Sequence, residues 1–335
     1  MSELDVVTGA TGFTGRYITR RLLDAGRRVR TLTGHPDRPN PFGNRIEIVP
    51  YNFADPKALG RNLEGVTTLY NTYWVRFPYG SQSYDNAIVN TRALIRAAEE
   101  ADVKKFVHVS IANPSEKAIA DGRACLQAAE EARGKKFLVN TSIASPLANY
   151  RLAYYWGKAF LEAALAQSAL SWAIIRPTVV FGLEDILINN IAWMVRHLPV
   201  FGVPGSGDYK LQPVFVEDLA QIATDAAGKQ ENVTVDAAGP ETYSFNGLVQ
   251  LIASKLGCRV RIAHVHPTLV YLMTRALGLA VHDVILTREE IEGLMTNLLV
   301  SHQPPLGTTP LSQWLEQNAD RVGRRYASEL DRHFR

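Results

Sequence analysis

The chain has 335 residues, 46% of them hydrophobic and 21% charged, so it can bury a large core and predicts about two domains. Its net charge of +3 is too small to indicate a nucleic-acid-binding protein or binding to an anionic membrane through charge alone. The two cysteines, Cys125 and Cys258, are expected to be buried thiols in a reducing compartment, and no histidine pair has metal-ligand spacing. We therefore predict neither a disulfide framework nor a metal site.

The first element is a short apolar run, Leu4–Val7, followed by the sequence TGATGFTG, Thr8–Gly15, and then by an amphipathic helical pattern. A strand, a glycine turn and a helix N-terminus form an arrangement that binds a pyrophosphate, because free amides and the helix dipole attract the anion. A strand this early also predicts no signal peptide and a cytoplasmic location. The predicted phosphate-binding residues are Gly9, Thr11, Gly12, Phe13, Thr14, Gly15 and Arg16.

Strand-like runs then alternate with helical ones as far as about Pro177. This alternation predicts a Rossmann-type, doubly wound parallel α/β sheet in residues 1–180, with right-handed crossovers. Residues 181–335 are expected to form a smaller, mainly helical α/β substrate lobe, from which some strands return to the sheet. The expected strands of the first domain are Leu4–Val7, Val29–Leu32, Ile46–Val49, Thr67–Thr72, Phe106–Ser110 and Trp172–Arg176.

In the second part, Val200–Gly207 is rich in glycine and proline and is expected to be a loop. Ser244 and Thr287 are expected to cap helices. The apolar stretch Pro267–Leu286 contains Arg275, His282 and Asp283 and is therefore no transmembrane helix. We expect it to be a buried helix, with a helix on a membrane surface as the alternative.

An internal duplication relates residues of about 92–114 to residues of about 123–146. Ten of 15 positions are identical between 92–106 and 123–137. If the strand-like run Phe137–Thr141 were inserted into the sheet, the helix that follows would move by one strand spacing, about 4.8 Å. We expect the second copy to loop outside the sheet instead.

Tyr154 and Lys158 lie four residues apart, so on a helix their side chains share one face. A nearby ammonium favours the phenolate form of a tyrosine and lowers its pKa. The pair therefore suits proton transfer to or from a carbinol oxygen while a nicotinamide exchanges hydride.

With these motifs the chain resembles the short-chain dehydrogenase/reductase superfamily, and in particular its extended and atypical, epimerase/dehydratase-like members. That subgroup includes proteins akin to the nucleotide-binding accessory subunit of respiratory complex I. The resemblance implies a bound nicotinamide dinucleotide and a C-terminal lobe that selects the substrate. The residues that carry it are Thr8–Gly15, Tyr154, Lys158, Arg176-Pro177-Thr178, Phe181-Gly182, Phe215–Leu219 and Gly239–Ser244.

The resemblance also implies a serine or threonine that orients the substrate carbonyl. Ser110, at the end of a predicted strand, and Ser142, 12 residues before Tyr154, are the candidates, and we favour Ser110. By the same resemblance, the residues that would line the substrate pocket are Asn189, Asn190, Trp193, Lys210 and Gln212.

The cofactor preference depends on the end of the second strand, Thr31–His35, which has no carboxylate before Asp37. An NAD-binding protein usually has an acidic residue there for the ribose hydroxyls. Arg16 and Arg38 would instead meet a 2′-phosphate, so NADP is favoured and NAD stays open. The further residues assigned to the cofactor are Asn52 and Phe53 at the adenine, with Asn71, Thr72, Lys158 and Pro177.

Two functions follow. The first is an NADP-dependent oxidoreductase or epimerase for a carbonyl or carbinol substrate, with Tyr154 as acid/base, Lys158 as ribose anchor and Ser110 as orienting hydroxyl. The second is a non-catalytic NAD(P)H-binding protein with a structural, assembly or sensing role. The sequence does not identify the substrate, and it leaves homo-oligomerisation and peripheral membrane contact open.

Overall fold

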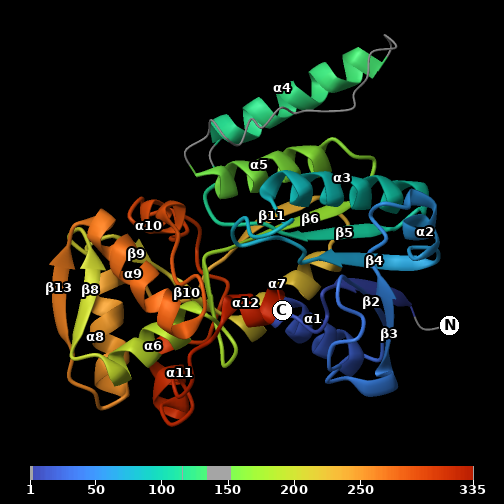
Figure 1. Cartoon of the computed structure of the whole chain (residues 1–335). Helices are drawn as coiled ribbons and strands as arrows, with labels where there is room; N and C mark the ends of the chain where they lie inside the picture. The colour runs from blue at the N-terminus through green and yellow to red at the C-terminus, as the bar shows by residue number, and fades with distance from the viewer. Residues whose placement is uncertain (1–2, 115, 134–151, 335) are drawn as a thin grey trace. The chain divides into compact units, whose positions relative to one another are not determined.

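The computed structural model describes residues 3–114, 116–133 and 152–334. The chain forms two compact units, shown in Figure 1. One unit comprises Met1–Arg176 and Ala220–Val235, and the other comprises Pro177–Leu219 and Asp236–Arg335.

The first unit is built on a seven-stranded sheet with the order β11-β6-β5-β4-β1-β2-β3. The β3–β2, β2–β1, β1–β4, β4–β5 and β5–β6 pairs are all parallel. This is the Rossmann order, so the predicted fold class is confirmed. The strands are β1 (Leu4–Thr8), β2 (Arg28–Thr33), β3 (Ile46–Pro50), β4 (Val66–Asn71), β5 (Lys105–Val109), β6 (Trp172–Pro177) and β11 (Val233–Ala237).

Helices cover both faces of this sheet (Figure 1). All five residues of β1 are buried, Asp5 among them, as a central strand of a parallel sheet is covered on both faces. The Ser83 hydroxyl accepts from the Asn86 amide and fixes the start of α3. The helices are α1 (Phe13–Asp24), α2 (Pro56–Arg61), α3 (Tyr84–Glu100), α4 (Glu116–Arg133), α5 (Ala153–Ala166) and α7 (Val216–Ala227).

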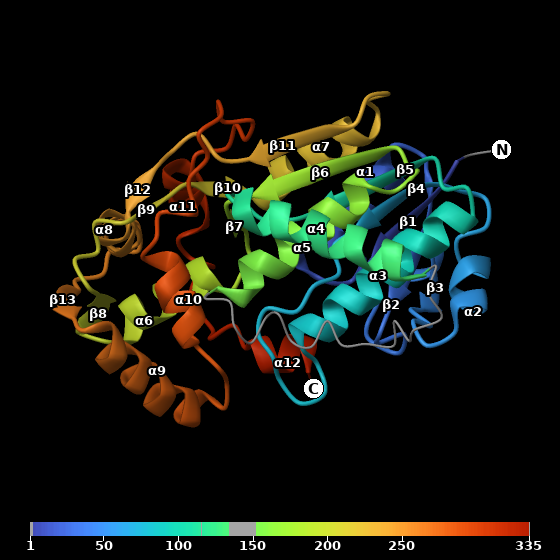
Figure 2. The same ribbon diagram turned by 90° about the horizontal axis from the view of Figure 1, so that it is seen from above.

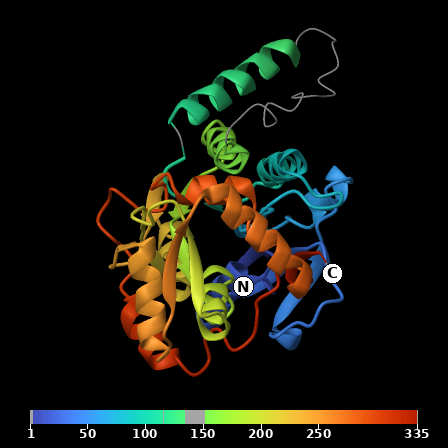
Figure 3. The same ribbon diagram turned by 60° about the vertical axis from the view of Figure 1, so that its left-hand side comes forward.

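The region of the duplication is partly described. Strands β5 and β6 pair directly, Phe106 with Trp172 and Val109 with Ile175, so no strand is inserted between them. Helix α4, in the second copy, lies outside α5, on the side away from the sheet (Figures 1 and 3). A Cβ at Gly122 would lie 3.2 Å from the Phe160 Cα, so the two helices approach closely there. The run Phe137–Thr141 and Ser142 lie outside the described residues.

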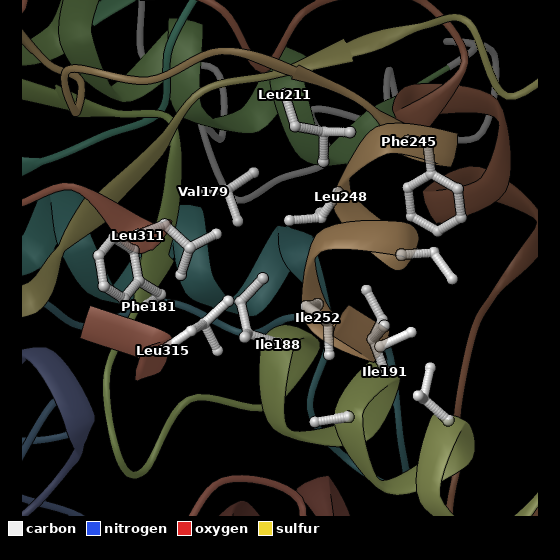
Figure 4. Close-up of a cluster of buried hydrophobic side chains, with 14 of the residues drawn as sticks. Val179, Phe181, Ile188, Ile191, Leu211, Phe245, Leu248, Ile252, Leu311 and Leu315 are labelled. Carbon is white, nitrogen blue, oxygen red and sulfur yellow. The ribbon is translucent and has the colours of Figure 1, made fainter. Parts of the chain in front are cut away.

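The second unit has its own hydrophobic core, part of which is drawn in Figure 4. Phe181, Ile188, Leu211, Leu248 and Leu315 meet there from five different segments. Its strands are β7 (Val179–Phe181), β8 (Val200–Pro204), β9 (Lys210–Leu211), β10 (Pro213–Phe215), β12 (Tyr243–Ser244) and β13 (Arg261–Val265). Its helices are α6 (Leu187–His197), α8 (Phe245–Lys255), α9 (Pro267–Val281), α10 (Arg288–Leu294), α11 (Leu311–Asn318) and α12 (Glu329–His333).

Two expectations for this unit are wrong. Residues 200–204, expected in a loop, form β8, which pairs in parallel with β13. The expected buried helix is α9, but only Val270 and Gly278 in it are buried. Ser244 and Thr287 cap α8 and α10 as expected. Within the described ranges, no helix is both long and apolar enough to cross a membrane.

Candidate functional site

The glycine loop between β1 and α1 is closed by contacts that only glycine allows. Gly9 has φ +66°, in the left-handed region, and its carbonyl accepts from the Gly12 amide at 2.8 Å. A Cβ on Gly15 would lie 2.2 Å from the Gly9 carbonyl oxygen. Gly15 therefore lets the first turn of α1 pack against the end of β1.

The N-terminus of α1 suits an anion. No side chain caps the helix at Gly12, and its first turn holds no acidic residue. Thr11, Phe13 and Thr14 lie half-buried along this loop and turn. Arg16 donates from Nη2 to the Thr11 carbonyl at 3.1 Å, which holds its cationic side chain at the loop. Backbone amides, the helix dipole and a guanidinium thus meet at one place, as a diphosphate requires.

Hydrogen bonds join the carboxyl ends of β1 and β4, where the strand order reverses. Thr72 Oγ1 donates to the Thr8 carbonyl at 2.6 Å, and Thr8 Oγ1 donates to Asn71 Oδ1 at 3.1 Å. The buried Asn71 amide also lies 3.0 Å from His108 Nδ1. Open α/β sheets bind ligands at this switch point. The Asn71 side chain is used within the protein, whereas Thr72 lies directly beside Gly9.

An aromatic cluster that the sequence analysis missed lies beside the glycine loop. The Tyr51 ring stacks on Phe53 at 4.7 Å and meets Tyr73 at 5.2 Å. The Tyr51 hydroxyl would lie 4.0 Å from a Cβ on Gly9, and its ring would lie 3.6 Å from a Cβ on Gly34. Burial raises the pKa of Tyr51, so its hydroxyl stays a neutral donor. The predicted adenine residue Phe53 thus belongs to a packed aromatic cluster.

The other residues assigned to the cofactor lie on loops or at the end of a strand. Asn52 follows β3 with φ +53°, a conformation that asparagine tolerates. Arg38 is half-buried in the loop after β2, and its amide donates to the His35 carbonyl at 3.3 Å. Pro177 is the last residue of β6 and is buried.

Lys158 is buried on α5, against the end of β5. Its Nζ donates to the Val109 carbonyl at 2.9 Å and lies 4.7 Å from the centroid of the Trp74 ring. The same indole meets the Tyr154 ring edge-on at 5.8 Å, so Trp74 contacts both members of the predicted pair. A Cβ on Gly157 would lie 2.8 Å from Trp74, which makes a small residue necessary there.

Burial dominates the electrostatics of this lysine. It disfavours the ammonium and lowers the pKa of Lys158 to about 7, while the charge of Glu162 acts in the opposite direction. Lys158 thus titrates near neutrality, and Glu162 helps to keep it protonated.

Ser110 forms a hydrogen bond within the protein. Its hydroxyl donates to Glu162 Oε1 at 2.5 Å. Arg176 holds the same carboxylate through Nη2 at 2.6 Å and Nε at 3.1 Å. The structure therefore joins Ser110, Glu162 and Arg176 into one hydrogen-bonded group, which the sequence analysis did not foresee.

The residues expected to line the substrate pocket are largely bonded to backbone groups. Asn189 donates to the Gly182 carbonyl at 3.1 Å, Asn190 to the Ala327 carbonyl at 3.0 Å, and Gln212 to the Gly239 carbonyl at 2.8 Å. Trp193 stacks on His197 at 4.7 Å, and Lys210 is exposed.

Among the residues that the structure describes, no three potential ligands gather as a metal site.

Known proteins are similar to this chain in sequence or in fold. Subunit 9 of the mitochondrial NADH dehydrogenase (ubiquinone) 1 alpha subcomplex from Arabidopsis thaliana is 24% identical over 73% of this chain, which spans 56% of that subunit. Among solved structures, triphenylmethane reductase of Citrobacter sp. with NADP(H) has a TM-score of 0.69, 16% identity, and coverage of 95% of this chain and 99% of the reductase. Escherichia coli quinone oxidoreductase with NADPH has a TM-score of 0.67, 17% identity, and coverage of 93% and 99%.

The chain therefore has the fold of reductases that bind NADP(H), and its relatives include a mitochondrial NADH dehydrogenase subunit. The family described as NAD(P)H-binding matches residues 9–184, which is more than half of the chain. The protein belongs to this NAD(P)H-binding family.

Proposed function

We propose that the protein is an NADP(H)-dependent oxidoreductase or epimerase for a carbonyl or carbinol substrate, acting in the cytoplasm. The observation that carries the proposal is the buried Lys158, whose pKa is lowered to about 7. Both Lys158 and Tyr154 contact the ring of Trp74. A buried lysine with a shifted pKa next to a second titratable side chain is more typical of a catalytic site than of a packed core.

The cofactor fits the glycine loop. The amides of residues 12–14 and the Arg16 side chain would hold the diphosphate, because the turn lacks both a capping side chain and an acidic residue. Arg38 would meet the 2′-phosphate, and the Tyr51 and Phe53 rings would border the adenosine. The cofactor supplies hydride exchange at the substrate carbon.

The protein moves the proton. Tyr154 would donate its phenolic proton to the substrate oxygen in reduction and accept it in oxidation. Lys158, in its ammonium form, would stabilise the phenolate and bind the ribose. The Trp74 ring beneath the ammonium supports this position of the lysine.

Ser110 takes a narrower role in this proposal than the one expected. Because its only proton is donated to Glu162, its oxygen has lone pairs to offer but no hydrogen. A carbinol has a single hydroxyl proton, and oxidation passes it to Tyr154, so it cannot also be donated to Ser110. We propose that Ser110 orients the substrate oxygen only when its hydroxyl turns from Glu162 toward that oxygen, and that Glu162 and Arg176 are positioning residues.

The cofactor preference is tested by calorimetry with NADPH and NADH. We expect NADPH to bind about tenfold or more tightly, because a charged hydrogen bond to phosphate contributes about 1.5–3 kcal/mol. Arg38→Gln should weaken the binding of NADPH and leave the binding of NADH unchanged. Arg45→Gln, which replaces an exposed arginine directly before β3, should change neither affinity. Equal affinities would contradict the NADP assignment, and two flat titrations of folded protein would contradict the whole proposal.

A non-catalytic, NAD(P)H-binding role in a larger assembly is the second candidate, favoured by the similarity to the NADH dehydrogenase subunit. Oxidation of NADPH in the presence of a library of carbonyl compounds separates the two. Turnover supports the enzyme. Tight NADPH binding without turnover of any compound supports the binding role.

Glu162→Gln should shift the pH dependence of the reaction. Removing the carboxylate removes the charge that raises the pKa of Lys158, so this pKa should fall below about 7. The ammonium is lost as pH rises through that pKa, so kcat/KM should decline at a lower pH than in the wild type, as a pH–rate profile would show.

The matched control is Glu100→Gln, which removes an exposed carboxylate from α3 that is paired with Arg96. It should leave the profile unchanged. A Glu162→Gln protein that is folded and has the wild-type profile would show that Glu162 does not act on Lys158.

A further inference from the structure

Helix α9 presents an apolar stripe to solvent. Leu269, Leu272 and Met273 are 50%, 53% and 50% exposed, and Leu279 is 81% exposed. Positions three, four and seven apart share one side of a helix, so these side chains, with the exposed Ala276 and Ala280, form a single stripe. We call these six residues the α9 stripe. Figure 2 shows α9 on the outer side of its unit.

The packing of α9 fixes this orientation. Its inner side is held by the buried Val270 and by Gly278, where a Cβ would lie 2.5 Å from the Asp283 carbonyl oxygen. The Asp283 amide donates to the Gly278 carbonyl at 3.0 Å, and the Asp283 carboxylate binds the Tyr326 hydroxyl at 2.8 Å. The helix cannot rotate to bury the stripe without breaking these contacts.

Helix α9 itself carries no negative charge, and α10, which packs against it, adds Arg288 together with Glu289, Glu290 and Glu292. Residues 267–281 contain no aspartate or glutamate, and the only charged side chain among them is the exposed Arg275. The guanidinium groups of Arg275 and Arg288 lie 5.9 Å and 4.9 Å from the centroid of the Tyr271 ring. Both cations are therefore gathered at one edge of the apolar side chains.

We propose that the α9 stripe docks on an anionic phospholipid bilayer. An apolar face with flanking arginines suits the boundary between acyl chains and negatively charged headgroups. The 15-residue helix is about 22 Å long, less than the roughly 30 Å hydrocarbon core, so it lies along the surface. A second copy of the chain is a poorer occupant, because six residues of one helix fall short of the roughly 800 Å² per partner of a stable interface.

The test is co-sedimentation of the full chain with phosphatidylcholine vesicles, with and without phosphatidylglycerol. We expect binding to the anionic vesicles, weakened at least about tenfold in Leu272→Gln/Leu279→Gln, because the buried apolar area is lost. Arg275→Gln should weaken binding to the anionic vesicles only. The matched control is Val89→Gln, since Val89 is 63% exposed on α3, outside the stripe, and should bind like the wild type.

Three outcomes would overturn the proposal. The first is that the wild-type chain sediments with neither kind of vesicle. The second is that Val89→Gln loses as much binding as the double variant. The third is a dimer, seen by light scattering, that the double variant abolishes, which would make a second copy the occupant. None of these results depends on NADPH binding or turnover, so they leave the proposed function untouched.

Discussion

Replacing Tyr154 with phenylalanine should lower kcat by about 10²- to 10⁴-fold, the usual contribution of a general acid or base. The substitution removes only the hydroxyl, so the edge-on contacts of the ring with Trp74 at 5.8 Å and Tyr84 at 6.0 Å stay in place. The proposed diphosphate site lies on a different segment, at the start of α1. The substitution should therefore lower kcat, while the Kd for NADPH stays within about twofold of the wild-type value.

The measurement is NADPH oxidation with a compound that the wild type reduces, together with calorimetry of NADPH binding. Tyr155→Phe is the matched control, since Tyr155 is the next residue on α5 and also half-buried. It should keep nearly full activity. If Tyr154→Phe turns over like the wild type, the acid/base assignment is wrong even where NADPH binds tightly.

The elements of the dinucleotide-binding unit could be predicted because their signals are local. The run from Leu4 to Gly15 contains a buried strand, a left-handed glycine and a helix start within a dozen residues. Alternation of short apolar runs with helices was then enough to predict a doubly wound parallel sheet, although not the order of its strands. The same reasoning placed the predicted strands within a residue or two of the observed ones.

The site around Lys158 could be predicted only in part, because its other members are remote in sequence. Ser110 and Glu162 are 52 residues apart, and no spacing rule joins them. Trp74 follows β4 and reaches α5 through space, where Gly157 leaves room for its ring. The helical periodicity of α5 places Glu162 on the same side as Lys158, one turn later. This spacing was the one signal in the sequence that Glu162 lies near Lys158.

The two errors in the second unit have a common origin. Glycine and proline in Val200–Gly207 predict a loop, but β8 gains a partner in β13, about 60 residues later in the chain. Mean apolarity predicts that Pro267–Leu286 is buried, but burial depends on which side of α9 the neighbouring segments cover. Non-local pairing decided both outcomes against the local pattern.

Replacing Gly15 with alanine should abolish NADPH binding and destabilise the fold. The new methyl carbon would lie 2.2 Å from the Gly9 carbonyl oxygen and 2.8 Å from the Gly9 carbonyl carbon. Both are backbone atoms, so the clash cannot be relieved by a side-chain rotation and α1 must move away from β1. We expect a loss of about 1–3 kcal/mol in the free energy of unfolding, as for an overpacked core.

The loss of NADPH affinity should exceed about a hundredfold, because the same movement separates the α1 amides from the rest of the glycine loop. Urea unfolding and calorimetry measure the two effects separately. Gly60→Ala is the matched control, because Gly60 lies in α2 and an added Cβ would have nothing within 4 Å. Alanine there should stabilise the helix by up to about 1 kcal/mol and leave NADPH binding unchanged. If Gly15→Ala bound NADPH like the wild type, the close approach of α1 to β1 would not be what builds the diphosphate site.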